Sequence, residues 1–297
     1  MKYGVHRVTW GGYYDQDNVE EFFAQVKSTG AETVEMRPTD AMLMHKKKQI
    51  QEIRNLAEDA GLELLFSFGF PEALDMRSPD LYIRQYAVDH LIKAIESIAM
   101  AGGKEFGGAG IYSGWPTHFQ HDLVTPEAKY ERTMRSIECM RKAAPVAEEL
   151  GVMLNFEILN RFENYILNTV EEGISYCSQI ESKNCGLLLD TFHMSMEEDD
   201  LEGAIEKAGD LIGQFHVTEP NRGIPFHTKR INWPEIGRAL KRIGYDKTVT
   251  IEAAVAFEGE ATYNLRMWRN LLPDISLESR LNALREGLCY IRAQFED

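Results

Sequence analysis

The chain has 297 residues, of which 44% are hydrophobic and 27% are charged, and its formal net charge is −15. This length suits one large barrel or two ordinary domains with a sizeable core, and the composition is that of a globular protein. The negative charge disfavours binding to nucleic-acid phosphates, and no apolar run is long enough to predict a membrane span.

The first residues and the cysteines bear on the cellular compartment. The segment Met1–Val8 lacks the apolar region of a signal peptide and is predicted to be a first strand. The cysteines are scattered and form no C-x-x-C pair; they are Cys139, Cys177, Cys185 and Cys289. This usage is typical of inert core thiols in a reducing compartment, so we expect a cytoplasmic protein.

Short apolar runs alternate with helical periodicity along the chain. The runs that predict strands are Tyr3–Val8, Thr33–Met36, Glu63–Phe68, Glu105–Ile111, Val152–Glu157, Gly186–Asp190, Ile212–His216 and Thr248–Glu252. Predicted helices between them include Asn18–Thr29, Tyr82–Ala101 and Lys129–Leu150. Glycines that can end a helix in the left-handed conformation follow five of the helical segments, at Gly30, Gly61, Gly102, Gly151 and Gly244.

This alternation predicts an α/β fold, a single (β/α)8 TIM barrel that spans residues 1–297 as one domain, because no linker-like stretch divides the chain. Three long segments follow predicted strands: Tyr112–Thr125, Thr218–Asn232 and Val255–Ile275. On a barrel they would lie on the catalytic face, where long loops are usually functional.

The fifth to eighth predicted strands each end on a side chain that can bind a metal. These residues are Glu157, Asp190, His216 and Glu252. Adjacent barrel strands bring such ends to one mouth, and three carboxylates would repel one another there without a cation. Singly, Asp190 could cap a helix and His216 could be a core histidine, but their equivalent positions favour a site for Mn²⁺, Mg²⁺ or Co²⁺.

Other polar residues near these strand ends suit a polyhydroxylated ligand. Glu163 follows Glu157 closely, His193 lies three residues after Asp190, and Glu219 and Arg222 follow His216. An alternative is that Arg161 and Glu163 form a local ion pair and that His193 only lies on a loop. Aromatic candidates for stacking against a sugar are Trp10, Phe68 and Trp115, with ordinary packing as an equal alternative.

Glu157 and Glu252 stand at opposite ends of this arc of four strands. They would therefore face a metal-held substrate from opposite sides. Two carboxylates so placed can act as base and acid on a carbon next to a carbonyl, and the metal would stabilise the resulting enediolate.

Two motifs resemble the ketose 3-epimerase family, also called the D-tagatose 3-epimerase or D-allulose 3-epimerase family, within the xylose-isomerase-like TIM barrels. They are E-I-L-N-R-F-E at 157–163, followed by L-N-T at 167–169, and L-D-T-F-H-M at 189–194. The resemblance, which covers nearly the whole chain, implies that Glu157, Asp190, His216 and Glu252 bind the metal and that Glu157 and Glu252 move the C3 proton. It further implies substrate binding by Glu163, His193 and Arg222, and we expect His6 and Trp115 to join them.

The resemblance also implies a cofactor and partners. We expect one divalent metal ion per subunit, with Mn²⁺ first and Co²⁺ or Mg²⁺ as alternatives. The expected partner is a small-molecule ketose sugar, and the expected assembly is a homodimer or homotetramer.

The sequence departs from the family pattern in two places, and other functions stay open. Thr218-Glu219-Pro220 and Ala253-Ala254 replace the Gly-Glu and Pro-Phe pairs of many members, which leaves the preferred sugar undecided. The alternatives are an aldose–ketose isomerase, a metal-dependent lyase or dehydratase on the same barrel, and a sugar-binding protein without catalysis. A DNA-repair endonuclease is disfavoured by the net charge and the single histidine ligand.

Overall fold

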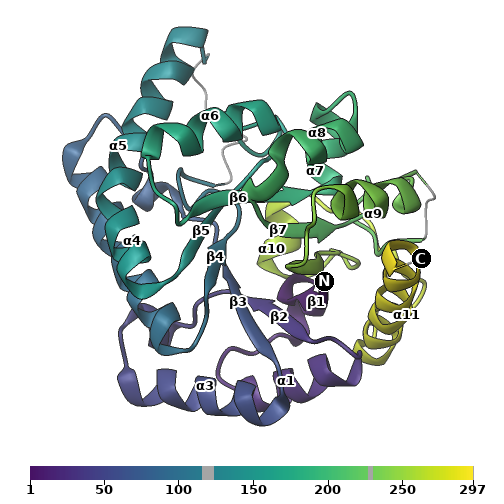
Figure 1. Cartoon of the computed structure of the whole chain (residues 1–297). Helices are drawn as coiled ribbons and strands as arrows, with labels where there is room; N and C mark the ends of the chain where they lie inside the picture. Colours follow the sequence, from purple (N-terminus) through teal and green to yellow (C-terminus); the bar gives the residue numbers. More distant parts are fainter. Residues whose placement is uncertain (116–123, 227–229, 297) are drawn as a thin grey trace.

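The computed structural model describes residues 1–115, 124–226 and 230–296, and its eight parallel strands close into a barrel in sequence order (Figure 1). The strands are β1 (Lys2–His6), β2 (Thr33–Met36), β3 (Glu63–Ser67), β4 (Glu105–Gly107), β5 (Met153–Glu157), β6 (Cys185–Asp190), β7 (Ile212–Val217) and β8 (Thr248–Ile251). Pairing of β1 with β8 closes the barrel. The predicted (β/α)8 fold is confirmed.

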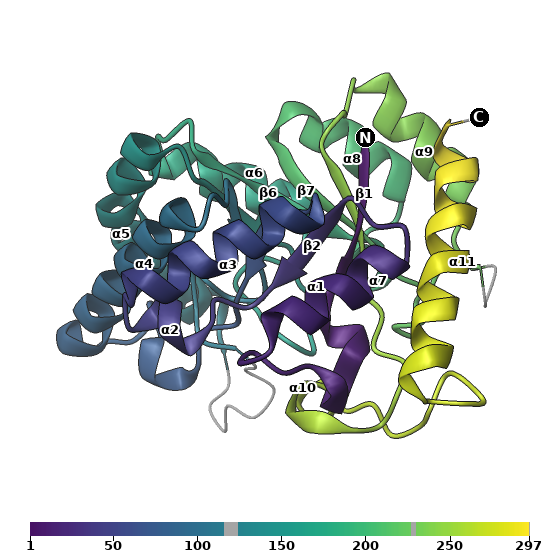
Figure 2. The ribbon, with the colours of Figure 1, turned by 90° about the horizontal axis from the view of Figure 1, so that it is seen from below.

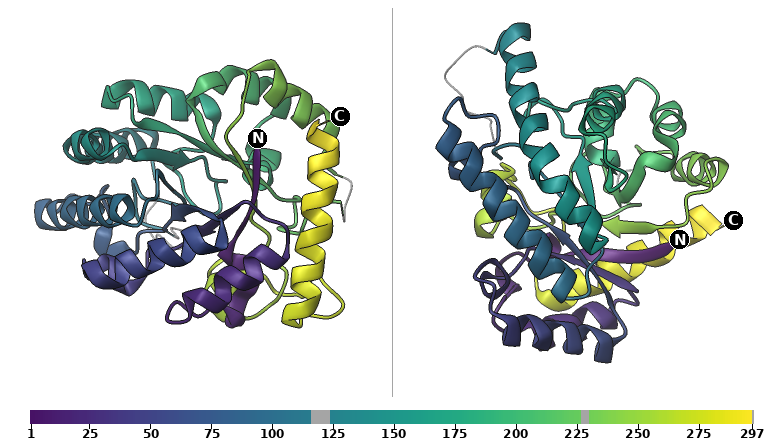
Figure 3. Two further views of the ribbon diagram at one scale, coloured as in Figure 1. Left: turned by 60° about the horizontal axis from the view of Figure 1, so that its bottom comes forward. Right: turned by 60° about the vertical axis from the view of Figure 1, so that its left-hand side comes forward.

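Helices surround the strands, as two further directions show (Figure 3). They are α1 (Val19–Ser28), α2 (Asp40–Leu43), α3 (Lys47–Ala60), α4 (Leu81–Met100), α5 (Pro126–Leu150), α6 (Val170–Ile180), α7 (Thr191–Glu197), α8 (Leu201–Ala208), α9 (Trp233–Arg242), α10 (Gly259–Asn264) and α11 (Leu277–Glu296). Short 3-10 helices are η1 (Arg7–Tyr13), η2 (Glu72–Leu74) and η3 (Gly209–Leu211). Within the described ranges, no helix combines the length and the apolar character needed to cross a bilayer.

The barrel strands are buried because helices cover their outer faces. All six residues of β6 and all six of β7 are buried, as is typical of parallel strands covered on both sides. The helix ends follow the glycine pattern: Gly61 and Gly151 end α3 and α5 in the left-handed conformation. In Figure 2, α10 lies at the end of the barrel to which the strands point, and both termini lie at the other end.

Some strand ends differ from the prediction. β1 stops at His6, where the chain turns into η1, and β4 stops at Gly107 instead of Ile111. The glycines that follow β4 have positive φ angles, 104° at Gly108 and 85° at Gly110, which strand pairing cannot accommodate. Parts of two predicted long loops, 116–123 and 227–229, lie outside the described residues.

The cysteines only partly match the expectation of core thiols. Cys139, Cys177 and Cys185 are buried and burial raises the pKa of all three, so they are poor nucleophiles at neutral pH. Cys289 is instead exposed. Helical periodicity did not exclude this, because α11 has both a buried and an exposed face.

Glu105 lies at the amino end of β4, on the opposite face of the barrel from the strand ends that carry the candidate site. Burial raises its pKa to about 7, although Asn155 donates a hydrogen bond to the carboxylate. The folded chain therefore holds a proton that the unfolded chain loses near pH 4.5. The stability that the protonated Glu105 contributes is full below about pH 4.5 and is lost as the pH rises through about 7.

Glu105→Gln should therefore stabilise the protein at pH 8 by about 1 kcal/mol, a value reduced for partial solvent screening, and change little at pH 4. Urea unfolding at both pH values measures this difference. An equal effect at both pH values would contradict the assignment.

Candidate active site

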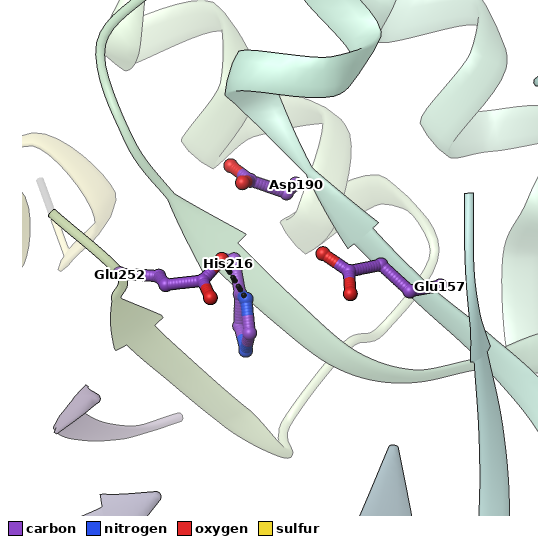
Figure 4. Close-up of side chains that lie close together, drawn as sticks. All are labelled: Glu157, Asp190, His216 and Glu252. Atoms are coloured by element: carbon purple, nitrogen blue, oxygen red, sulfur yellow. Dashed lines mark hydrogen bonds and ion pairs between the residues drawn. The ribbon is translucent and has the colours of Figure 1, made fainter. Parts of the chain in front are cut away.

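The four predicted ligands meet at the carboxyl ends of β5 to β8 (Figure 4). One oxygen or nitrogen atom from each of Glu157, Asp190, His216 and Glu252 lies within 4.8 Å of the other three. Glu157 and Asp190 are the last residues of β5 and β6, whereas His216 is the penultimate residue of β7 and Glu252 follows β8. The predicted convergence is therefore correct, although two of the strand ends shift by one residue.

Asp190 has one oxygen occupied and one without a hydrogen bond. Its Oδ1 accepts from the backbone N–H of Phe192 at 3.0 Å and so caps α7. Its Oδ2 is buried and has no hydrogen-bond partner among the described residues. A fully buried carboxylate oxygen without a hydrogen bond is costly, and it sits where the other three side chains converge.

The pKa values of the carboxylates in the cluster shift in opposite directions. Burial raises the pKa of Glu157 well above its usual value and that of Asp190 to about 6. Burial also acts on Glu252, but His216 and Arg222 outweigh it and hold its pKa well below the usual value. At neutral pH and without an ion, the site therefore favours a protonated Glu157 beside an ionised Glu252.

Arg222 links the cluster to the predicted substrate-binding residues. Its Nη1 lies 3.2 Å from Glu252 Oε2, and its Nη2 lies 2.9 Å from Glu163 Oε1. Its guanidinium stacks 4.1 Å from the ring centre of Phe192. The residue is buried and adopts a φ of 65°, a conformation unusual for a side chain other than glycine or asparagine and frequent at functional sites.

His193 lies inside the cluster and not on an exposed loop. It is buried in α7, and its Nδ1 accepts from the backbone N–H of Asn160 at 3.0 Å. Its Nε2 lies 3.5 Å from Glu157 Oε1 and 3.2 Å from Arg222 Nη2. The alternative position on a loop is therefore wrong.

Arg161 pairs with Glu197 at 2.8 Å, and not with Glu163. The alternative of a local ion pair within the motif is therefore also wrong. Glu219 is fully buried and accepts hydrogen bonds from Phe226 N–H and Trp233 Nε1–H at 3.1 and 3.2 Å. It therefore holds the segment after β7 and does not line the cavity that lies over the four predicted ligands.

Glu35 is a member of the site that the sequence analysis missed. It lies in β2, is fully buried, and its Oε2 is 2.8 Å from His216 Nε2. The other ring nitrogen of His216, Nδ1, lies 3.2 Å from Glu252 Oε2. A lone carboxylate inside an apolar predicted strand was the available signal, because burying such a group requires a partner.

His6 lines the cavity as expected, together with Ser67. Its Nδ1 accepts from Val8 N–H at 3.1 Å, and its Nε2 lies 3.0 Å from Ser67 Oγ. Burial lowers the pKa of His6 to about 4, so the ring is neutral at pH 7. A neutral imidazole and a hydroxyl thus form the wall opposite β5 and β6.

The three aromatic candidates separate into wall and core. Phe68 and Trp115 line the cavity, and Trp115 Nε1–H donates to Glu163 Oε2 at 3.2 Å. Trp10 is buried, donates to Gln25 at 2.8 Å and packs edge-on against Phe22, so it belongs to the core. The suggestion that Trp10 stacks against a sugar is wrong, because η1 turns its side chain toward α1.

Comparison with known proteins places this barrel in a family. Residues 23–271 match the family described as xylose isomerase-like TIM barrel. The chain belongs to this family. Within the xylose isomerase-like barrels, a D-psicose 3-epimerase of Ruminiclostridium cellulolyticum is 34% identical over 91% of this chain and 90% of that protein. A D-psicose 3-epimerase of Enterocloster bolteae is 32% identical over 99% of this chain and 96% of that protein.

Solved structures agree with the sequence relatives. D-psicose 3-epimerase from Clostridium cellulolyticum H10, determined with D-tagatose, superimposes with a TM-score of 0.92 at 31% identity over 99% of both chains. An L-ribulose 3-epimerase superimposes with a TM-score of 0.87 at 28% identity, covering 99% of this chain and 94% of that one. The predicted membership of the ketose 3-epimerase group and the isomerase class of carbohydrate epimerases is confirmed.

Proposed function

We propose that this protein epimerises a ketose at C3, with Glu157 and Glu252 as the groups that remove and return the C3 proton. The observation that carries the proposal is the placement of these two carboxylates in one cluster, at the ends of β5 and β8 on opposite sides of the arc. The names of the relatives support the choice of reaction, because the D-psicose, L-ribulose and ketose 3-epimerases among them span nearly the same length.

The cluster also suits one divalent ion per subunit. Glu157, Asp190, His216 and Glu252 would hold it, and the buried Asp190 Oδ2 without a hydrogen bond is an oxygen that an ion would satisfy. Three carboxylates and one imidazole are the donors preferred by Mn²⁺, with Co²⁺ and Mg²⁺ as alternatives. When bound, such an ion supplies positive charge that stabilises an oxyanion on the substrate.

The proton transfer follows from the opposed carboxylates. An ionised carboxylate on one face takes the C3 proton, which leaves an enediolate whose charge is shared between the substrate oxygens. A protonated carboxyl group on the other face returns a proton to C3 and inverts it. One of the two groups must therefore release a proton while the other takes one up.

The neighbouring residues orient the sugar and exclude water. Glu163, His193 and Arg222 form one hydrogen-bonded group beside Glu157, and we propose that they bind the oxygens next to the reacting carbon. His6 and Trp115, on other sides of the cavity, would contact the remainder of the substrate. The predicted homodimer or homotetramer and the cytoplasmic location stay predictions.

Deuterium exchange tests this function. The purified protein is incubated with Mn²⁺ and D-fructose, D-tagatose or L-ribulose in deuterated water. We expect deuterium at C3 and the C3 epimer in the product. Label at C1 or C2 with an aldose product would identify an isomerase, and loss of water would identify a dehydratase; no exchange in any ketose would overturn the proposal.

Glu35→Gln should weaken Mn²⁺ binding by about 10- to 100-fold, because a carboxylate hydrogen-bonded to a ligating histidine fixes its ring and raises its basicity. Calorimetric titration of Mn²⁺ into the chelator-treated variant measures the change. Glu32→Gln is the matched control, since Glu32 precedes β2 on the surface and pairs with Arg292. Equal affinity in the Glu35 variant would show that His216 needs no such partner.

A further inference from the structure

A larger chamber lies beside the cavity over the four-residue cluster. This outer chamber has a volume of about 410 Å³ and shares Arg7, Phe68, Gly69 and Trp115 with the walls of the inner cavity. The shared walls show that the two spaces are adjacent. A chamber of this size belongs to the range that binds small molecules, so a ketose held at the cluster has room for a further group at its far end.

Two arginines line the outer chamber. Arg7 directly follows β1, and its guanidinium lies 5.3 Å from the ring centre of Tyr14. Arg37 directly follows β2, and its guanidinium lies 5.0 Å from the ring centre of Phe68. Both come from strand ends, so the barrel itself aims two cations at one space next to the catalytic cluster.

Two described acidic residues near the chamber each have an arginine partner. Glu258 also lines it, but the buried Arg280 and the backbone N–H of Gly12 bind its carboxylate. Asp40 pairs with Arg37 at 3.2 Å between the carboxylate and Nη2, and both side chains are partly exposed there. The buried Nε of Arg37 still has no hydrogen-bond partner among the described residues.

Two arginines thus line one chamber in a protein whose formal net charge is −15. Both arginine charges reach one hydroxyl: burial raises the pKa of Tyr14, and Arg7 and Arg37 both oppose that rise. Two cations that share one confined space repel each other, and an oxyanion between them would relieve the repulsion. Guanidinium groups match carboxylate and phosphate oxygens particularly well.

We propose that the outer chamber binds an oxyanion, a carboxylate or a phosphate, at the end of the substrate distant from C3. This inference rests on the proposed epimerase function and narrows its substrate class from free ketoses to ketoses with an anionic terminus. Arg7 and Arg37 act as specificity-determining residues, while the carboxylates of the inner cluster do the chemistry.

The test compares three substrates that differ only at C6: D-fructose, its 6-phosphate and its 6-carboxylate analogue. We expect kcat/KM for at least one anionic substrate to exceed that for D-fructose by at least 10-fold, and the better of the two identifies the anion. In Arg7→Met and Arg37→Met the ratio of anionic to neutral kcat/KM should fall at least 10-fold. Arg37→Lys, which retains the charge, should keep part of the preference.

Arg54→Met is the matched control, because Arg54 lies on the surface of α3 in an ion pair with Glu58 and should not change the ratio. Epimerisation of D-fructose at least as fast as of both anions, with ratios unchanged in the Arg7 and Arg37 variants, would overturn this inference while the proposed function stands. If no ketose exchanges its C3 hydrogen, the proposed function fails, and the inference is then tested by binding alone. Calorimetry with the Mn²⁺-treated protein should still show at least 10-fold tighter binding of an anion than of D-fructose, and equal binding would overturn the inference.

Discussion

Glu252→Gln should lower the rate of C3 epimerisation by about 10³- to 10⁴-fold while sugar binding remains measurable, because the amide cannot take up or return the proton. The replacement is nearly isosteric, and its carbonyl oxygen can still accept from Arg222. Single-turnover kinetics and calorimetric sugar binding separate the two effects. Because Glu252 is also a proposed metal ligand, the Mn²⁺ content of the variant is measured alongside.

The partner variant Glu157→Gln makes the test sharper. Each variant keeps one of the two proton-transfer groups, so each should still exchange the C3 hydrogen of one epimer with solvent and not that of the other. The two variants should show opposite preferences. Glu206→Gln, a surface change on α8 beside Arg242, is the control and should behave as wild type. Near-normal epimerisation by the Glu252 variant would remove Glu252 from the mechanism.

Arg222→Met should lower the free energy of unfolding of the metal-free protein by about 3–5 kcal/mol at pH 8, since breaking a buried ion pair leaves uncompensated charge. The guanidinium contacts Glu163 and Glu252 and lies 3.7 Å from Asp190, so its loss exposes three buried carboxylates to one another's repulsion. Urea unfolding measures the loss, which should shrink at pH 5 as carboxyl groups take up protons.

Mn²⁺ should restore part of this stability, because a dication in the cluster replaces the missing positive charge. Arg238→Met is the control: Arg238 is also paired with a glutamate, but its side chain is 55% exposed and its removal should cost much less. An Arg222 variant as stable as the control would show that the carboxylates are not held apart by this residue.

The ligand cluster was predictable because one rule places all four residues. Parallel barrel strands bring their carboxyl ends together, so Glu157, Asp190 and His216 could be grouped without knowing any contact. Glu35 was not predicted because its partner His216 lies 181 residues away and neither residue has a motif that points to the other. Arg7 and Arg37 follow the neighbouring strands β1 and β2, but neither stands in a motif that indicates a role.

Orientation was harder to predict than proximity. Trp10 lies close to a strand end, as its position suggested, but η1 turns it into the core. Glu219 follows His216 as closely as Arg222 does, but its carboxylate accepts hydrogen bonds from Phe226 and Trp233 and does not reach the site. Such choices depend on turns of a few residues, where hydrophobic periodicity carries no information.

The two carboxylate oxygens of Asp190 have different roles. Since Oδ1 is fastened to the start of α7, the carboxylate cannot swing away, and Oδ2 faces the proposed ion whether or not the ion is there. Capture of a cation at this position would need no rearrangement of the main chain. A divalent ion should then bind to this site without a slow conformational step.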